Sequence, residues 1–310
     1  MKLSAAIVCS VCVSAILLAS AEGRGRAARP PRVALTFDDL PDHGPLPPGS
    51  SRVDVARSIV AALQAHHAPP VYGFINAQQL EAHPADAEVL RLWRGAGFPL
   101  ANHTFSHMDL HTNSVEDFER DVAANEPALR SYMADRNWHW FRFPYLREGD
   151  TPERHRAVRN MLARRGYRVA QVTLSFDDYA YNDPYARCVA RNDRDGIAWL
   201  QQSYRERASE GLLRGRDEAR ALFGRDIGHV MLLHIGAFET VMLPRLLDIL
   251  HQHGFVLTTL EDAQADAIYR TVPDTTGTWS GTFLEQMAAA RHRQPPAPSD
   301  VFARLGALCR

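Results

Sequence analysis

Short apolar runs alternate along the chain with stretches in which apolar residues recur every three or four positions. The apolar runs predict β-strands, and the amphipathic stretches between them predict helices. Seven strands are expected, at 33–37, 71–75, 98–101, 140–143, 167–175, 229–234 and 255–260. Because strands that alternate with helices form parallel βα units, the pattern predicts an α/β fold.

Capping and turn residues mark several of the expected helices. Ser114 begins one of them, and Asp117 completes a capping-box-like pair. A second helix follows the cap Thr151 and ends near Gly166. A long helical insertion is expected over about 195–222. The segment 271–310 is rich in turn-forming residues, which predicts a C-terminal tail that lies on the surface or is partly disordered.

Polar side chains stand at the ends of five of the seven expected strands. In chain order they are Asp38 and Asp39, His103, Arg142 and Tyr145, Asp177 and Asp178, and His234. In a βα barrel the carboxyl ends of the strands meet on one face, where these groups would converge. An open doubly wound sheet is the alternative, but it gathers ligands mainly at one switch point. The pattern therefore favours a distorted (β/α)7-type barrel, with a single catalytic domain over 32–270.

The first 21 residues have the pattern of a secretory signal. Lys2 precedes an apolar run that ends in small residues at 19–21, so cleavage is expected after Ala21. The apolar run is short for a bilayer, which makes an uncleaved anchor the lesser alternative. We therefore expect an exported protein, periplasmic or secreted, with no stable membrane span after cleavage.

Composition and cysteine usage agree with one exported globular domain. The chain has 310 residues, of which 45% are hydrophobic, and a formal net charge of −1. That balance gives no reason to expect nucleic acid or an acidic membrane as a partner. Removal of residues 1–21 leaves two cysteines, Cys188 and Cys309, which can pair in an oxidising compartment. Two unpaired buried thiols explain the count as well.

The first chemical signal is a pair of histidines, His103 and His107, four residues apart. On a helical turn this spacing places two imidazoles on one face, where they can share a metal ion. A carboxylate from Asp38 or Asp39 would supply a third ligand and leave positions open for water and substrate, as in catalytic sites. His111 continues the spacing and is a decoy candidate. The alternative is a hydrogen-bonded polar loop.

Five short motifs then carry a resemblance to a known family. They are TFDD (36–39), HTFSH (103–107), RFPY (142–145), DDY (177–179) and LLH (232–234). In this order they resemble the motifs of the polysaccharide deacetylases, the NodB-homology family, also called carbohydrate esterase family 4. The resemblance covers about 32–265. It implies the NodB-homology form of the barrel.

The resemblance also implies roles for the polar residues at the strand ends. It makes Asp38 the general base, oriented by Arg142. It makes Asp39, His103 and His107 the ligands of a divalent metal, usually Zn²⁺, with Co²⁺, Ni²⁺ and Mn²⁺ as alternatives.

The remaining roles concern the leaving group and the substrate. The resemblance implies that His234 is the general acid, paired with Asp178, and that the backbone N–H of Tyr145 donates to the oxyanion. It places Leu232 beside the acetyl methyl group. Because Asp177 adjoins Asp178, the choice of the His234 partner stays open by one residue.

The sequence departs from the common family pattern at Leu40, where many members have Gly, and at Tyr179, where Trp is usual. Tyr179, Tyr181 and Tyr185 are the candidates for stacking on a sugar ring. The aromatic run 138–141 is expected in the core. His43, His66, His67, His83 and His139 are expected to be ordinary surface or loop residues.

These inferences predict an exported, metal-dependent hydrolase that removes acetyl groups from an acetylated carbohydrate. A polymer or oligomer containing N-acetylglucosamine, of the peptidoglycan or chitin type, is the first expectation for the substrate. An esterase for O-acetylated sugars of the acetylxylan type would use the same groups. A carbohydrate-binding relative without turnover is the alternative from another class.

Overall fold

The computed structural model describes residues 30–134, 136–273, 281–293 and 300–310. The predicted signal peptide lies outside the described residues. All seven expected strands are present: β1 (Arg32–Leu40), β2 (Tyr72–Ile75), β3 (Leu100–Asn102), β4 (Trp140–Phe141), β5 (Arg168–Val169), β6 (Gly228–His234) and β7 (Val256–Leu257).

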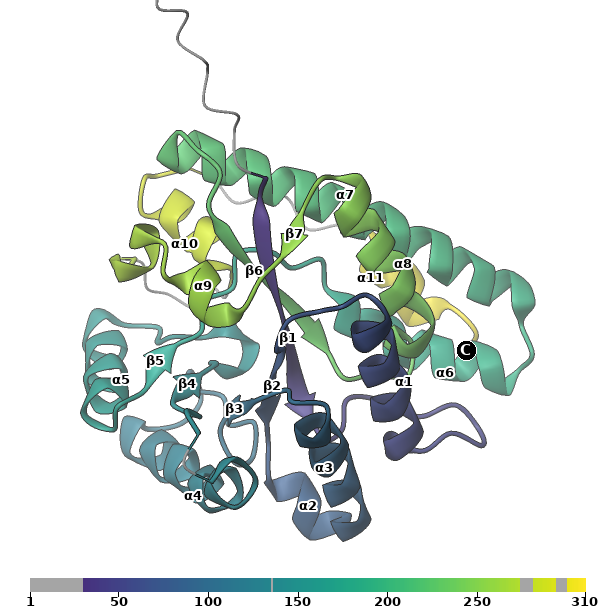
Figure 1. Ribbon diagram of the computed structural model, residues 1–310, viewed down its shortest axis with the longest axis horizontal. Helices are drawn as coiled ribbons and strands as arrows, with labels where there is room; N and C mark the ends of the chain where they lie inside the picture. Colours follow the sequence, from purple (N-terminus) through teal and green to yellow (C-terminus); the bar gives the residue numbers. More distant parts are fainter. Residues whose placement is uncertain (1–29, 135, 274–280, 294–299) are drawn as a thin grey trace, which may run out of the picture.

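Helices surround the strands (Figure 1). They are α1 (Arg52–Ala65), α2 (Gln78–Ala82), α3 (Ala87–Gly95), α4 (Val115–Met133), α5 (Pro152–Arg164), α6 (Asn182–Ala190), α7 (Arg194–Phe223), α8 (Glu239–Gln252), α9 (Leu260–Gln264), α10 (Phe283–Ala289) and α11 (Val301–Ala307). Short 3₁₀ turns η1 (Pro84–Asp86), η2 (Pro144–Leu146), η3 (Asp178–Tyr181) and η4 (Ala267–Arg270) lie between them.

The strands form one parallel sheet in the order β5-β4-β3-β2-β1-β6, and β7 pairs with the start of β1. β1 is buried over nearly its whole length, as expected of a central parallel strand covered on both faces. Its register with β6 places Asp38 opposite His234. The pairing thus brings two predicted catalytic residues to one edge of the sheet.

The curled sheet is drawn together by the segment that follows β5. The amide of Ala170 still donates to Phe141 of β4, but Thr173 and Leu174 donate to Val230 of β6. The expected fifth strand, 167–175, is therefore not one continuous strand. A local hydrogen bond from the Gln171 N–H to the Val169 carbonyl, two residues back, turns the chain and interrupts it. The segment after β5 thus bonds first to β4 and then to β6, so it links the two edges of the curled sheet. The predicted distorted barrel is confirmed.

Local sequence accounts for where the helices begin. The side chains of Ser51, Ser114 and Thr151 each accept a hydrogen bond from the backbone N–H three residues on, so they act as N-caps of α1, α4 and α5. Pro152 takes the first position of α5, where its missing N–H costs nothing. The buried positions of α1 recur at helical spacing and face the core.

The predicted helical insertion is the long helix α7, which crosses one side of the fold in Figure 1. Asp193 caps its start, and Gly224, with a φ of +71°, ends it. Gly211 and Gly215 let the helix approach the segment after β5: a Cβ at Gly211 would lie 3.2 Å from the Cβ of Phe176. α7 therefore covers the place where the sheet closes.

The C-terminal segment is more ordered than its composition suggests. Phe283 of α10 is fully buried, and its N–H donates to the Val172 carbonyl at 2.6 Å. The capping box between Thr282 and Glu285 fixes the start of the helix. The expectation of a surface tail is thus wrong for α10, because α7 and η4 offer it an apolar face. Residues 274–280 and 294–299 lie outside the described residues.

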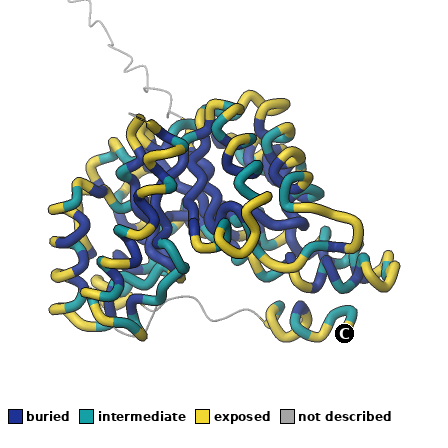
Figure 2. The backbone as a smooth tube through the Cα atoms, turned by 90° about the horizontal axis from the view of Figure 1, so that it is seen from below, coloured by how far each residue is buried: buried dark blue, intermediate teal, exposed yellow. Residues whose placement is uncertain are grey.

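Cys188 of α6 and Cys309 form a disulfide, as expected from the two remaining cysteines. The bond joins positions 121 residues apart and ties the end of α11 to the domain. In Figure 2 the C-terminus lies beside exposed helices, while the buried backbone fills the interior.

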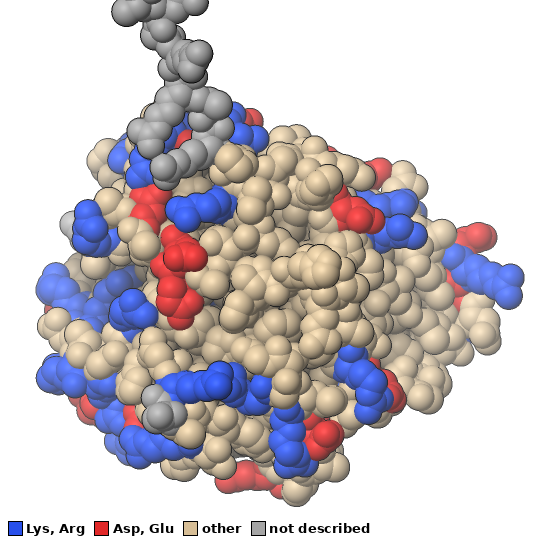
Figure 3. All heavy atoms as spheres, viewed as in Figure 1, with Lys and Arg blue, Asp and Glu red and all other residues tan. Residues whose placement is uncertain are grey.

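On the face shown in Figure 3, acidic and basic side chains lie next to one another, in keeping with the net charge of −1. In the described residues, no helix has the length and apolar character needed to cross a bilayer.

We expect Phe283→Ala to lower the free energy of unfolding by about 3–5 kcal/mol, because it removes a fully buried ring and leaves a cavity. Chemical denaturation followed by circular dichroism measures the change. Phe302→Ala is the matched control, since that ring on α11 is 39% exposed. If both variants unfold alike, α10 is not part of the folded core.

Candidate metal centre and active site

The carboxyl ends of the strands open into a cavity of about 550 Å³. Its lining includes nearly all the predicted site residues: Asp38, Asp39, His103, His107, Tyr145, Tyr179, Leu232 and His234. Arg142 and Asp178 are buried directly behind this lining and contact Asp38 and His234. Residues spread over two hundred positions of the sequence therefore meet in one place, as the barrel geometry predicts.

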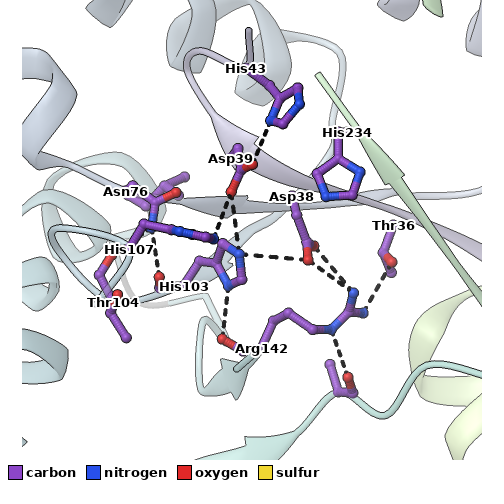
Figure 4. Close-up of polar contacts among 12 residues, drawn as sticks. Thr36, Asp38, Asp39, His43, Asn76, His103, Thr104, His107, Arg142 and His234 are labelled. Carbon is purple, nitrogen blue, oxygen red and sulfur yellow. Dashed lines mark hydrogen bonds and ion pairs between the residues drawn. The ribbon is translucent and has the colours of Figure 1, made fainter. Parts of the chain in front are cut away.

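Asp39, His103 and His107 form the cluster that a metal ion would need. One ligand atom from each lies within 4.8 Å of the others. The Nε2 atoms of His103 and His107 are 3.3 and 3.4 Å from Oδ1 of Asp39. Figure 4 shows both imidazoles and the carboxylate facing one another. His111, the next histidine in the spacing, is not part of this cluster.

The chemistry of these donors fits a divalent metal. Oδ1 of Asp39 is buried and has no hydrogen-bond partner, which is costly for a carboxylate oxygen unless a cation binds it. Nδ1 of His103 donates to the Arg142 carbonyl at 2.8 Å, so its Nε2 carries the free lone pair. Burial and the neighbouring His103 lower the pKa of His107 to about 4, which keeps that imidazole neutral and able to bind. Two imidazoles and one carboxylate match an open zinc-type site.

Asp39 itself is held ionised. Burial alone would raise its pKa, but the neighbouring His103 and the hydrogen bond from His43 hold the pKa well below its usual value. An ionised carboxylate beside the neutral imidazole of His107 is the protonation state that metal binding requires.

Several site residues have left-handed backbone conformations, which non-glycine residues rarely adopt. They are Asp39 (φ 66°), Thr104 (63°), His107 (56°), Tyr145 (57°) and Asp177 (61°). Each such residue costs about 1–3 kcal/mol and persists only where the surroundings enforce it. Their concentration around one cavity marks it as a functional site rather than as a packed corner of the fold.

Asp38, adjacent to Asp39, makes different contacts. Nη1 of Arg142 lies 3.2 Å from both of its carboxylate oxygens. Arg142 is almost fully buried and is fixed by Thr36 Oγ1 and the Ala170 carbonyl. Burial lowers the pKa of Arg142 and Asp38 counteracts this, so the two form a buried ion pair.

His234 pairs with Asp178 as predicted, and not with Asp177. Its Nδ1 lies 3.0 Å from Oδ1 of Asp178, and its backbone N–H donates to Oδ2 at 2.7 Å. Burial alone would lower the pKa of His234, but Asp178, with smaller contributions from Asp39 and Asp38, raises the pKa to about 9. Asp177 instead pairs with Arg207 at 2.8 Å. His234 is therefore protonated at neutral pH. Its Nδ1 is paired with Asp178, and its Nε2 points away from that carboxylate.

Two aromatic rings stand at the mouth of the cavity. Tyr145 and Tyr179 are 53% and 44% exposed, and they pack edge-on against His107 and His234. Two other proposed sugar-stacking residues do not reach the cavity: Tyr181 is fully buried in the core, and Tyr185 packs against Phe238. These two expectations are wrong, because η3 and α6 turn their rings inward.

The sequence interpretation missed several lining residues. His43 was expected to be an ordinary loop residue, but its Nδ1 lies 2.7 Å from Oδ2 of Asp39. Its separation of four residues from Asp39 was the available signal. Further missed lining residues, Arg214, Thr282 and Glu285, come from the insertion and the C-terminal segment. No local pattern marks them, since only the docking of α7 and α10 brings them to the cavity.

Comparison with known proteins now identifies the family. Residues 25–170 match the family model described as polysaccharide deacetylase. Over these residues the chain matches the polysaccharide deacetylase family, whose motifs it carries in the expected order. The chain has no match among curated proteins.

Solved structures agree on the fold of this chain. The chitin deacetylase of the fungal pathogen Colletotrichum lindemuthianum is 22% identical, with a TM-score of 0.53, and the alignment covers 77% of this chain and 89% of that one. A mutant of BA3943, a CE4 family pseudoenzyme with restored enzymatic activity, is 14% identical, with a TM-score of 0.51 and coverage of 76% and 67%. These identities establish the fold alone, which is the NodB-homology form of the barrel.

Proposed function

We propose that the protein is an exported, metal-dependent hydrolase that removes acetyl groups from a carbohydrate containing N-acetylglucosamine. One observation carries the proposal. A single cavity joins a metal-type ligand cluster, an arginine-paired carboxylate and a carboxylate-paired histidine, which are the three parts that amide hydrolysis needs.

Asp39, His103 and His107 would hold the metal. The mixed nitrogen and oxygen donors favour Zn²⁺, with Co²⁺, Ni²⁺ and Mn²⁺ as alternatives. When bound there, such an ion lowers the pKa of a water molecule towards about 7 and polarises a carbonyl oxygen.

The protein's own groups would then handle the protons. Asp38, held in place by the Arg142 guanidinium, would accept a proton from the attacking water. His234, held protonated by Asp178, donates its proton to the departing amine nitrogen. The backbone N–H of Tyr145 would stabilise the oxyanion, a contribution worth about 3 kcal/mol in comparable sites. Leu232 supplies an apolar surface for the acetyl methyl group.

The shape of the cavity supports a sugar substrate. The exposed rings of Tyr145 and Tyr179 flank the ligand cluster and offer faces on which a pyranose can stack. A relative of similar fold is described as a chitin deacetylase, which supports a polymer or oligomer of the chitin or peptidoglycan type. An O-acetyl ester would use the same groups, so the assay below includes it.

A binding protein without turnover is the competing function, and one structural neighbour is described as a pseudoenzyme. Loss of the base or the acid is the change expected of such a protein. Here Asp38 and His234 are both present and both have their partners, which supports an active enzyme.

Export is proposed from the N-terminal pattern and from the Cys188–Cys309 disulfide, since disulfides persist in oxidising compartments. Fractionation of cells that express the full chain, with mass determination of the product, tests it. We expect a periplasmic or secreted protein that begins after Ala21.

The function is tested by acetate release from N-acetylglucosamine oligomers and from O-acetylated xylan fragments. We expect release from the N-acetyl substrate that falls to background with a chelator and returns when Zn²⁺ is added, because the ligand cluster is part of the machinery. The same chelator saturated with zinc is the control. Release from the ester alone would make the protein an esterase, and no release from either substrate would favour the binding protein.

A further inference from the structure

His43 occupies a place that no predicted role accounts for. It follows β1 by three residues, lines the cavity, and its side chain is 20% exposed. Its ring lies 4.8 Å from that of His234, centroid to centroid. It is not a member of the ligand cluster formed by Asp39, His103 and His107.

The contact of His43 divides the two oxygens of Asp39 between different partners. Nδ1 of His43 lies 2.7 Å from Oδ2, and because a carboxylate only accepts, this nitrogen donates. Oδ1 points the other way, towards the Nε2 atoms of His103 and His107. Figure 4 shows His43 on the far side of Asp39 from these two imidazoles.

The loop that carries His43 is itself fastened. The N–H of Asp42 donates to the Asp39 carbonyl at 2.8 Å, a turn that folds the chain back over the carboxylate. Arg52 of α1 then holds both sides of His43, with its guanidinium 2.6 Å from Asp42 Oδ1 and 2.7 Å from the Gly44 carbonyl. His43 is therefore presented to Asp39 by an anchored loop and not by a free chain.

We propose that His43 is a positioning residue for the metal: it holds Oδ2 of Asp39 and thereby keeps Oδ1 directed at the ion. The inference rests on the metal site of the proposed function. Without this hydrogen bond the carboxylate can rotate about its Cβ–Cγ bond, and one defined ligand atom is lost. Removal of a residue that hydrogen-bonds to a metal ligand typically weakens metal binding about 10–100-fold.

The test compares His43→Ala with His43→Asn and measures the Zn²⁺ dissociation constant by competition with a chelating dye. We expect Ala to weaken binding about 10–100-fold. Asn should recover most of the affinity, because its amide Nδ2 reaches the position of the imidazole Nδ1. His251→Ala, an exposed histidine in the last turn of α8, is the control and should bind as the wild type does.

The visible spectrum of the Co²⁺-loaded protein gives a second readout that a purely structural role would not move. We expect the Ala variant to differ from the wild type and the Asn variant to resemble it. Circular dichroism of the metal-free proteins checks folding, and if Ala does not fold, His43→Leu, which fills more of the space but donates no hydrogen bond, takes its place.

Two outcomes separate the inference from its foundation. A wild-type protein that binds no divalent metal overturns the proposed metal site. A wild type that binds Zn²⁺ with a folded His43→Ala variant of equal affinity and spectrum overturns only the role of His43. The role of His43 is also overturned if His43→Ala loses Zn²⁺ affinity and His43→Asn loses as much, because the hydrogen bond would then not be the cause.

Discussion

Asp38→Asn is expected to lower the rate of acetyl release about 10²–10⁴-fold while the protein still binds its metal. The substitution keeps the size of the side chain but removes the group that accepts a proton from water. Asp38 is not a member of the ligand cluster, so metal content should persist. Acetate release and metal content, measured on the same preparations, check both parts.

His103→Ala provides the contrast. It removes an imidazole of the ligand cluster, so we expect the loss of both metal and activity. Because Asp38→Asn leaves the buried Arg142 without its anionic partner, the unfolding transition of each variant must also be measured. A folded Asp38→Asn variant with near wild-type turnover would show that another group is the base.

The difference between the two aspartates comes from their partners rather than from their position in the sequence. Asp38 faces an arginine across the sheet, and Asp39, in a left-handed conformation, faces the two imidazoles. Two adjacent anions in a buried place repel each other, and a guanidinium beside one with a cation beside the other would offset that cost. Under the proposed function, the adjacent pair would thus supply one base and one ligand.

The sequence predicted those features that local patterns determine. Strand positions, helix caps such as Ser114 and Thr151, and the convergence of strand ends all follow from periodicity and parallel topology. The choice between Asp177 and Asp178 could not be made in this way. Both follow the same apolar run, and only the turn at Asp177, with a φ of 61°, sends one carboxylate to Arg207 and the other to His234.

The features that were missed depend on contacts between distant segments. The burial of α10 depends on the apolar face that α7 leaves open, and α7 lies more than sixty residues earlier. The inward rings of Tyr181 in η3 and Tyr185 in α6 depend on packing against Tyr204 and Phe238. Composition marks such residues as polar, aromatic or turn-forming but carries no information on which face they present.

Asp178→Asn is expected to move the alkaline limb of the pH–rate profile to lower pH. In the wild type the pKa of His234 is about 9, because Asp178, with smaller contributions from Asp39 and Asp38, counteracts the effect of burial. Without that negative charge, burial lowers the pKa of His234 from about 9, and the more distant charges of Asp39 and Asp38 offset only part of the fall. His234 can donate a proton only at pH values below its pKa. Because the substitution lowers that pKa, the loss of activity in Asp178→Asn should grow as the pH rises. The loss of activity should be largest at about pH 8–9, where the wild-type imidazole still holds its proton, and small at about pH 5.5.

Asp177→Asn is the matched control for this shift. It removes one negative charge from the adjacent position with the same change of side chain, but Asp177 pairs with Arg207 and makes no contact with His234. Its alkaline limb should therefore stay near that of the wild type. The measurement is the pH profile of kcat/KM, because this quantity reports the pKa values of groups in the free enzyme, the state in which the His234–Asp178 pair is described. If Asp178→Asn leaves the alkaline limb in place, the proton given to the leaving nitrogen does not come from His234, because no other interaction of that imidazole holds its charge as strongly.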